Sequence, residues 1–451
     1  MKKWLVRLGA LAYTLGLSTL VQAQEGSFAE HKYKAKDGVE RPYIVYTGKE
    51  VRAQEKRPLI VYLHGAISNP NLPNTERSSR RSVMNKLADE GGYYVLYVFG
   101  QKGATWFDQV GRDMILGELA EVKRSYPIDE NKVFLGGFSD GASGTMYMAA
   151  SHGTPFAGYI ALNGSISVSA TLGLSPVYLE NINHKPMYVV NTLSDFLYPV
   201  KMMQPTIDKM RSYHQSITYR TPEGNHDPLY FPTLQSEVRA FVDSCVRQSP
   251  TSISLEASDS INNSYEWLSI TGIGEGEPAE WHRPYSMVLT NDKASLGVSP
   301  SPKHQGVGMV VGGWGKKSCL RDAGIAIGDT ILRLDTVLLT DPRALFGYVG
   351  TKRAGDKFTA TVLRQGVEQV LELQFPPAYD YEVFTKQPKS AKVLARLDGS
   401  TLHLQTSRVK ALAIDLERLP WVKRPKRLTI LCDGKSIVVK KPRGVYTLEL
   451  K

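Results

Sequence analysis

Between residues 40 and 245, short β-branched and aromatic runs alternate with stretches of helical spacing, and this alternation constrains the fold more than any other feature. The runs are short and apolar enough to be strands buried on both faces. Strands that alternate with helices form a parallel sheet with helices on both faces, in which ligands bind at the carboxyl ends of the strands. The expected strands are 41–46, as an edge strand, 59–63, 94–99, 133–136, 158–162, 187–191 and 217–220, and the expected helices are 114–126, 142–150, 206–213 and 237–245.

A GxSxG pattern, Gly137-Phe138-Ser139-Asp140-Gly141, lies between one of these strands and a helix of small residues. The pattern alone is weak, but this position is informative, because the glycines allow a sharp turn that exposes the serine hydroxyl. The helix N-terminus behind the turn places amide donors and a positive dipole end where an oxyanion would form. Ser139 is therefore the predicted nucleophile, and an idle serine in a glycine-rich turn is the alternative.

A serine hydroxyl needs a base within hydrogen-bond reach, and the base needs an acid that orients it. Of the nine histidines, His226 follows the last expected strand and precedes the final helix, whereas His214 lies at a polar helix end. Asp195 comes directly after the strand 187–191, in the chain order Ser, Asp, His. We expect His226 to be the base and Asp195 the acid, with a turn-forming role for Asp195 as the alternative.

A second oxyanion donor is expected in the loop Leu63-His64-Gly65-Ala66, where Gly65 allows an amide near Ala66 to point at the site. Its partner would be the amide of Asp140. His64 and Trp106 are the candidates for the substrate pocket. His64 could instead brace the loop, and Trp106 could be a core aromatic residue.

Residues 40–245 resemble the α/β-hydrolase superfamily, and above all its secreted polyhydroxybutyrate-depolymerase-like and feruloyl-esterase-like branch, near the prolyl-oligopeptidase-like hydrolases. The matching stretches are Leu63–Gly65, Gly103–Trp106, Tyr126–Asp129 with Lys132–Phe134, Gly137–Gly141, Asp195 with Tyr198-Pro199, and Gly224–His226. The resemblance implies hydrolysis of an ester, or less often of a peptide, without a metal or organic cofactor. Asp140 departs from the family, where Met or Gln is common, and a carboxylate there would weaken anion binding unless it points outward. A serine peptidase and a catalytically silent binding scaffold are the alternative functions.

Residues 294–376 resemble a bacterial PDZ domain, most specifically over Arg321–Asp335. The resemblance implies a carboxylate-binding loop at Leu296, Gly297 and Val298, and a groove beside a helix at 341–349 that could take the C-terminus of a polypeptide. A domain kept for stability or shape, with no bound peptide, is the alternative. We expect the domain to be inserted into a small β-rich domain made of 249–293, which could also be a linker, and 377–451.

The C-terminal region is basic, because residues 391–451 hold 14 lysines and arginines against 5 acidic residues, in a chain of net charge +11. An anionic surface is the partner that this charge suggests, a solvated face is the alternative, and nucleic acid is not expected.

The N-terminus has the order of a secretory signal peptide at 1–23. Lys2, Lys3 and Arg7 precede the apolar run 8–21, and Val21-Gln22-Ala23 ends it. An exported protein, periplasmic or secreted, is therefore expected, with the α/β-hydrolase domain at 24–248. Three cysteines cannot form a disulfide framework, and we expect free thiols.

Overall fold

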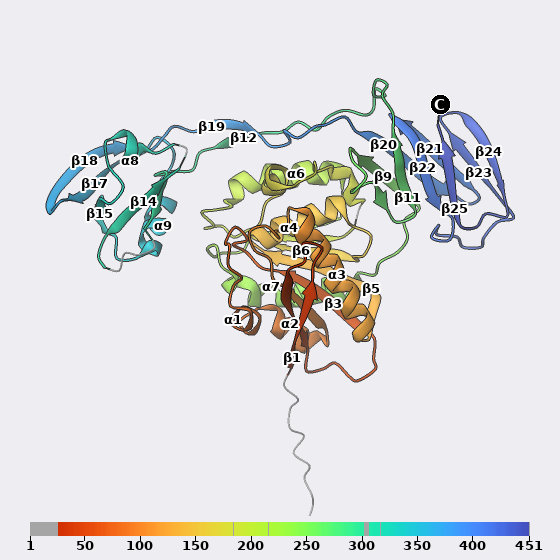
Figure 1. Cartoon of the computed structure of the whole chain (residues 1–451), viewed down its shortest axis with the longest axis horizontal. Helices are drawn as coiled ribbons and strands as arrows, with labels where there is room; N and C mark the ends of the chain where they lie inside the picture. The colour runs from red at the N-terminus through yellow and green to blue at the C-terminus, as the bar shows by residue number, and fades with distance from the viewer. Residues whose placement is uncertain (1–25, 184, 215, 302–305, 316, 451) are drawn as a thin grey trace, which may run out of the picture.

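The computed structural model describes residues 26–183, 185–214, 216–301, 306–315 and 317–450. The expected signal peptide at 1–23 lies outside these residues. A central N-terminal domain carries one smaller domain on either side (Figure 1).

The N-terminal domain is built on one eight-stranded sheet with the order β1-β2-β4-β3-β5-β6-β7-β8. The pairs β1–β2 and β2–β4 are antiparallel, and the strands from β4 to β8 run parallel. This is the mostly parallel sheet that the alternation predicts. Its strands are β1 (Ser27–Lys34), β2 (Glu40–Thr47), β3 (Arg57–Leu63), β4 (Tyr94–Val98), β5 (Ile128–Phe138), β6 (Gly158–Leu162), β7 (Met187–Val190) and β8 (Ile217–Arg220).

Helices cover both faces of the sheet, and each face has its own apolar core. Side chains of α3, α4, α5 and α6 pack on one face, and those of α2 and α7 on the other. Successive residues of β3 divide between the two cores, as period-2 geometry requires. The helices are α1 (Thr75–Arg80), α2 (Met84–Gly91), α3 (Gln109–Ser125), α4 (Asp140–Ser151), α5 (Ile166–Leu172), α6 (Val200–Tyr213) and α7 (Phe231–Ser244), with the short turns η1 (Leu179–Ile182) and η2 (Pro228–Tyr230).

The expectation that 41–46 forms the edge strand is wrong. β1 pairs along the whole of β2 and takes the edge instead. β1 reads Ser-Phe-Ala-Glu-His-Lys-Tyr-Lys, and none of its residues is fully buried. A strand this polar, in which every second or third residue is exposed, lacks the continuous apolar run by which buried strands are recognised in a sequence.

A split β-domain follows, in which two sheets pack around a common core. β9 pairs with β20 and β11 with β22, so residues 252–273 and 391–449 form one unit interrupted by the intervening chain. This is the arrangement expected of an inserted domain. Its strands are β9 (Ser252–Ala257), β10 (Ser264–Tyr265), β11 (Leu268–Ile273), β20 (Ala391–Asp398), β21 (Thr401–Ser407), β22 (Val409–Asp415), β23 (Arg427–Cys432), β24 (Lys435–Lys440) and β25 (Val445–Glu449).

Within the interrupting chain, residues 294–375 form what we call the inserted domain, with its own core and the strand order β13-β14-β15-β17-β18. A two-stranded ribbon of β12 (Val288–Asn291) and β19 (Tyr379–Glu382) connects it to the split β-domain. The architecture is compatible with the PDZ resemblance, since β13 is an open edge strand. Its elements are β13 (Val298–Pro300), β14 (Met309–Trp314), α8 (Cys319–Asp322), β15 (Thr330–Leu334), β16 (Val337–Leu338), α9 (Pro342–Gly350), β17 (Lys357–Arg364) and β18 (Val367–Gln374).

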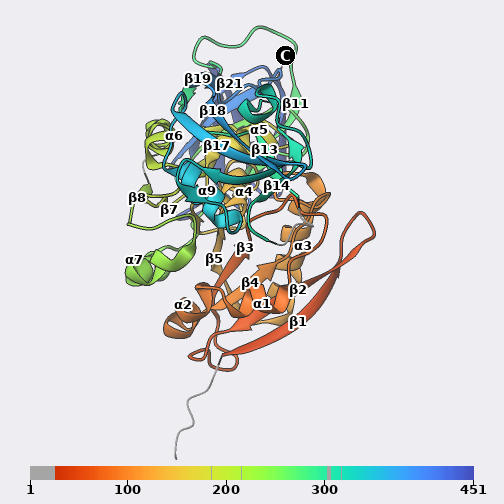
Figure 2. The same cartoon turned by 90° about the vertical axis from the view of Figure 1, so that its left-hand side faces the viewer.

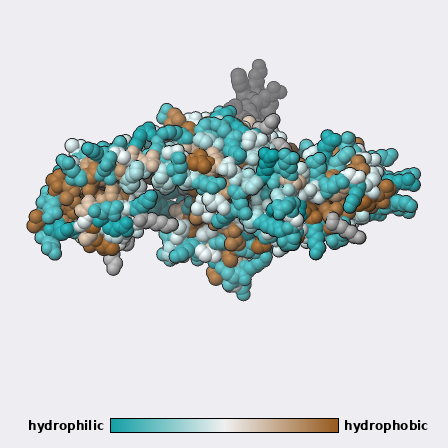
Figure 3. All heavy atoms as spheres, turned by 90° about the horizontal axis from the view of Figure 1, so that it is seen from above, coloured by the Kyte–Doolittle hydropathy of each residue, from teal (hydrophilic) through white to brown (hydrophobic). Residues whose placement is uncertain are grey.

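Seen from above, the molecule is elongated and mostly hydrophilic on this face, with the inserted domain at one end and the split β-domain at the other (Figure 3). The ribbon runs across the top of the N-terminal domain (Figures 1 and 2). In Figure 1, α9 lies on the side of the inserted domain that faces the N-terminal domain. Within the described ranges no helix combines the length and the apolar character needed to span a bilayer. Cys245, Cys319 and Cys432 are free thiols.

Candidate active site

Ser139 lies on the sharp turn between β5 and α4, at the carboxyl edge of the sheet. Its backbone has a positive φ of 59° with ψ −119°, a strained conformation for a residue with a side chain. The turn requires glycine behind it, because a Cβ on Gly141 would lie 2.0 Å from the carbonyl oxygen of Leu63. The strain holds the hydroxyl in place at the end of the strand, as the GxSxG pattern predicts.

Three side chains from three different strand ends form a continuous hydrogen-bonded row. The Oγ of Ser139 lies 2.9 Å from Nε2 of His226, and Nδ1 of His226 lies 2.9 Å from Oδ2 of Asp195. In the tautomer that this row requires, Nδ1–H donates to the carboxylate and Nε2 accepts from the serine hydroxyl. The structure thus brings together the three residues that the sequence analysis selects.

The carboxylate of Asp195 is fully enclosed and heavily hydrogen-bonded, with no exposed side-chain surface. Its Oδ1 accepts from the amides of Leu197 and Tyr198 at 2.8 and 2.9 Å, and its Oδ2 also accepts from the side-chain amide of Asn163 at 2.8 Å. Burial alone would raise the pKa of Asp195, but the hydrogen bonds from His226 and Asn163 outweigh it and hold the pKa below its usual value. The carboxylate is therefore held ionised beside the imidazole.

Asn163 is a residue that the sequence analysis missed. It follows β6 directly, has a left-handed φ of 53°, and donates to Asp195 and to Thr192 Oγ1, the latter at 2.9 Å. The hydroxyl of Thr192 in turn donates to the backbone carbonyl of Asn225, next to His226. The Asn-Gly pair at 163–164, directly after a buried strand, was the available signal, because asparagine tolerates a positive φ.

The loop after β3 approaches the serine closely, as expected of an oxyanion site. A Cβ on Gly65 would lie 2.9 Å from Cβ of Ser139, and Ala66 has a positive φ of 56°. The carboxylate of Asp140 accepts from the amide of Ile67 through Oδ2 at 3.0 Å, and its negative charge adds to burial in raising the pKa of Tyr198. Asp140 thereby ties this loop to the first turn of α4, where its own amide lies outside the intrahelical hydrogen bonds.

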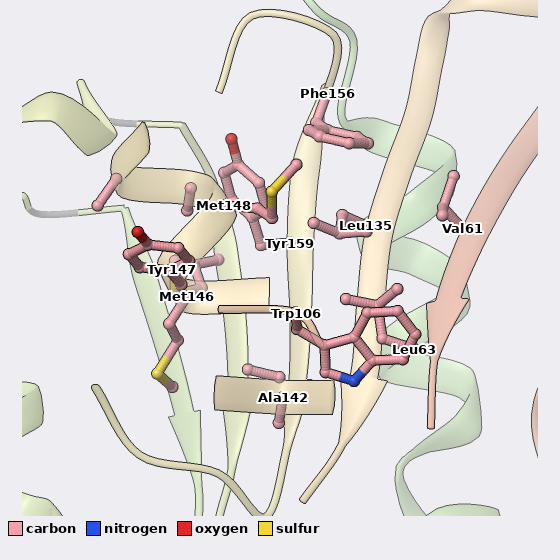
Figure 4. Close-up of a cluster of buried hydrophobic side chains, with 14 of the residues drawn as sticks. Val61, Leu63, Trp106, Leu135, Ala142, Met146, Tyr147, Met148, Phe156 and Tyr159 are labelled. Carbon is pink, nitrogen blue, oxygen red and sulfur yellow. The ribbon is translucent and has the colours of Figure 1, made fainter. Parts of the chain in front are cut away.

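The two candidates for the substrate pocket have other roles. Trp106 is completely buried, packs among Leu63, Leu135 and Ala142, and donates from Nε1 to the carbonyl of His64 at 2.9 Å (Figure 4). The expectation that it lines a pocket is therefore wrong, and it belongs to the core. His64 braces the loop, since its ring nitrogens lie 2.6 Å from Gly65 O and 3.1 Å from Gly100 N and O. Burial lowers the pKa of His64.

Tyr198 is a second neighbour of the serine that the sequence analysis did not assign. Its ring lies 5.5 Å from the ring of His226 between centroids. Burial raises the pKa of its phenol to about 12, and interactions with the hydroxyls of Ser143 and Ser139 oppose that shift. The phenol therefore stays protonated at neutral pH and is a hydrogen-bond donor beside the nucleophile.

The loop expected to bind a carboxylate lies in the inserted domain, directly before the edge strand β13. Leu296 is buried and its carbonyl accepts from Ser318 Oγ at 2.7 Å, while Val298 begins β13 opposite Trp314. A Cβ on Gly297 would lie 1.8 Å from Lys317 O, so this turn requires glycine.

In the described part of the chain, no group of three or more His, Cys, Asp or Glu residues is arranged to hold a metal ion.

Comparison with known proteins finds esterases among the chains similar to the N-terminal domain. Residues 93–232 match the family described as Phospholipase/Carboxylesterase. Over 154 residues the chain is 27% identical to the bifunctional acetylxylan esterase/xylanase XynS20E of Neocallimastix patriciarum, covering 34% of this chain and 22% of that protein. The chain thus spans about a fifth of the length of that relative.

Solved structures similar to the N-terminal half include a fluorophosphonate-binding serine hydrolase, FphF of Staphylococcus aureus, at 16% identity and TM-score 0.38, covering 48% of this chain and 98% of that one. A thermostable esterase matches at 21% identity and TM-score 0.39, covering 49% of this chain and 63% of that one. The family match lies entirely within the N-terminal domain, and together with the hydrogen-bonded row at Ser139 it supports a serine ester hydrolase.

Proposed function

We propose that this chain is an exported enzyme that hydrolyses a carboxylic ester through an acyl-enzyme on Ser139. The observation that carries the proposal is the continuous row from Ser139 through His226 to the enclosed Asp195, with both hydrogen bonds at 2.9 Å. The family match over residues 93–232 supports the same chemistry.

In the proposed reaction Ser139 Oγ attacks the ester carbonyl while Nε2 of His226 takes the hydroxyl proton. The ionised Asp195 stabilises the imidazolium that forms, and the amides of Asp140 and of the loop around Gly65 and Ala66 stabilise the oxyanion. When the tetrahedral intermediate collapses, the imidazolium gives its proton to the leaving alkoxide and the alcohol departs. A water molecule then loses a proton to His226 and attacks the acyl-enzyme. When this second tetrahedral intermediate collapses, the imidazolium returns the proton to Ser139 Oγ and the acid is released.

A fluorophosphonate probe and a set of p-nitrophenyl esters test this proposal. The wild-type chain should be labelled on Ser139 and hydrolyse a short ester, and Ser139→Ala should lose labelling and several orders of magnitude of kcat. Ser244→Ala, at the exposed end of α7, is the matched control and should behave as wild type. Ester hydrolysis that survives Ser139→Ala would refute the mechanism. Cleavage of unstructured polypeptides without ester hydrolysis would favour a peptidase.

Three further proposals concern the rest of the chain. The edge strand β13 and the loop before it would take a polypeptide C-terminus, and the exposed basic loop at 423–427 would face an anionic surface. Export would remove residues 1–23, so that sequencing of the secreted chain should begin at Gln24.

A further inference from the structure

The inserted domain contacts the N-terminal domain at the loop that carries the catalytic acid. We call residues 191–199, which join β7 to α6, the acid loop. The ring of Phe346 on α9 stacks on Phe196 of this loop, with 5.9 Å between centroids and 19° between planes. Nζ of Lys293 donates to the carbonyl of Leu197, and Asp292 forms a 2.6 Å ion pair with Lys201 in the first turn of α6.

These contacts act on the backbone that holds the acid in place. The amide of Leu197 donates to Oδ1 of Asp195, while the carbonyl of the same residue accepts from Lys293. Leu197 is therefore held at both of its backbone groups, one by the catalytic acid and one by Lys293, in the segment that joins β12 to the inserted domain. Asp292 is held in turn by Arg353 of the inserted domain at 3.2 Å.

The same contacts reach the imidazole. Phe196, whose outer face is covered by Phe346, meets the ring of His226 edge-on with 6.3 Å between centroids. Nζ of Lys293 lies 6.0 Å from the centre of the Tyr198 ring, which also packs against His226. Two aromatic contacts of His226 are thus backed by side chains from outside the N-terminal domain.

Charge adds a second link between the domains. Burial lowers the pKa of Lys293 to about 8, and the negative charges of Asp195 and Asp292 oppose that shift. Lys293 and the catalytic carboxylate therefore interact electrostatically, and the ammonium form of Lys293 favours the ionised form of Asp195.

We propose that Lys293 and Phe346 are positioning residues of the ester hydrolase, holding the acid loop so that Asp195 and His226 keep their alignment with Ser139. The inference rests on the proposed function. It makes the inserted domain part of the catalytic unit, in addition to any ligand that the domain binds. The interface is small and Phe346 remains 46% exposed, so few contacts carry this alignment.

The test compares full-length variants with a short p-nitrophenyl ester, and a fluorophosphonate titration counts the competent sites in each preparation. Lys293→Met removes the donor and the charge but keeps the length of the side chain, and Lys293→Arg restores both. Phe346→Ala removes the stacked ring from an exposed position, so the domain should still fold. Lys357→Met on β17 and Val370→Ala on β18 are matched controls from exposed positions of the same domain.

We expect kcat per titrated site to fall about 5- to 30-fold in Lys293→Met and in Phe346→Ala, because small displacements of catalytic groups cost up to about 100-fold. KM should stay within about twofold, Lys293→Arg should recover most of kcat, and the controls should match wild type. If the wild type is active and both variants keep its kcat per titrated site, the positioning role is overturned. The same holds if a lower number of titratable sites accounts for the whole loss of activity in the variants. A wild-type chain without a titratable Ser139 would instead refute the proposed function, and the positioning role with it.

Discussion

At the scale of single residues, Asp140 shows how an unusual side chain beside an oxyanion site can be accommodated. Its carboxylate keeps its negative charge, but a hydrogen bond from the amide of Ile67 orients it toward the loop after β3. The same bond fixes the spacing between the two segments that would donate to the oxyanion. Asp140 is thus better described as a tie between loop and helix than as a defect of the site.

We predict that Asp140→Ala lowers kcat about 10- to 100-fold, since the loss of an oxyanion donor costs about 100- to 1,000-fold and here the donors are displaced, not removed. Asp140→Asn should stay within a few-fold of wild type, because its amide oxygen can still accept from Ile67. Steady-state kinetics of the three proteins on one short ester measures the difference. Equal kcat in the alanine variant and wild type would show that the tie is dispensable.

Much of this site follows from sequence because each catalytic residue lies at or a few residues beyond the carboxyl end of a recognisable strand. Ser139 follows β5, Asp195 lies beyond β7 and His226 beyond β8, and parallel strands bring their carboxyl ends to one edge. Trp106 was ambiguous because a buried aromatic residue and a pocket-lining one have the same local sequence. The roles of Lys293 and Phe346 could not be predicted from the sequence, because no local pattern encodes a contact between domains.

At the scale of the elements, Asp335 joins the helix of the inserted domain to its sheet. The carboxylate, at the turn between β15 and β16, accepts from Lys352 Nζ at 2.7 Å, Tyr348 Oη at 2.8 Å and the amide of Thr359 at 2.8 Å. The hydrogen bond from Lys352 is the main reason why the pKa of Asp335 falls to about 2. α9 is thereby fixed against β17, which also sets the position from which Phe346 reaches the acid loop.

We predict that the inserted domain loses stability as the pH falls from about 4 to about 2. The folded pKa of Asp335 lies below the usual value of about 3.9, so the unfolded state binds the proton first in this window. Above it, the ionised carboxylate stabilises the fold. Asp335→Asn should lower stability at neutral pH and flatten this part of the pH dependence. Hydrogen exchange of peptides from 330–364 across pH measures both effects, and an equally steep acid loss in the variant would contradict the assignment.

At the scale of the whole molecule, the split β-domain is joined to the N-terminal domain by side chains that replace a neighbouring strand. β9 is the edge of its sheet, and two asparagines at and just after η1 pair with its backbone. Asn181 exchanges two hydrogen bonds with Glu256, at 2.8 and 2.9 Å, and Asn183 does the same with Ser254, at 2.7 and 2.8 Å. An exposed edge strand is thereby capped, and the domain gains a fixed orientation.

We predict that the double variant Asn181→Ala with Asn183→Ala loosens this junction while leaving the active site intact. Four hydrogen bonds of about 0.5–1.5 kcal/mol net each are removed, so opening of β9 should become easier by about 2–6 kcal/mol. Exchange at the amides of Ser254 and Glu256 should accelerate at least tenfold, with kcat on a short ester within twofold of wild type. Asn263→Ala, which breaks a hydrogen bond inside the split β-domain only, is the control and should leave β9 protected. If the double variant lost ester hydrolysis as well, the two domains would be coupled through this junction and not only through the acid loop.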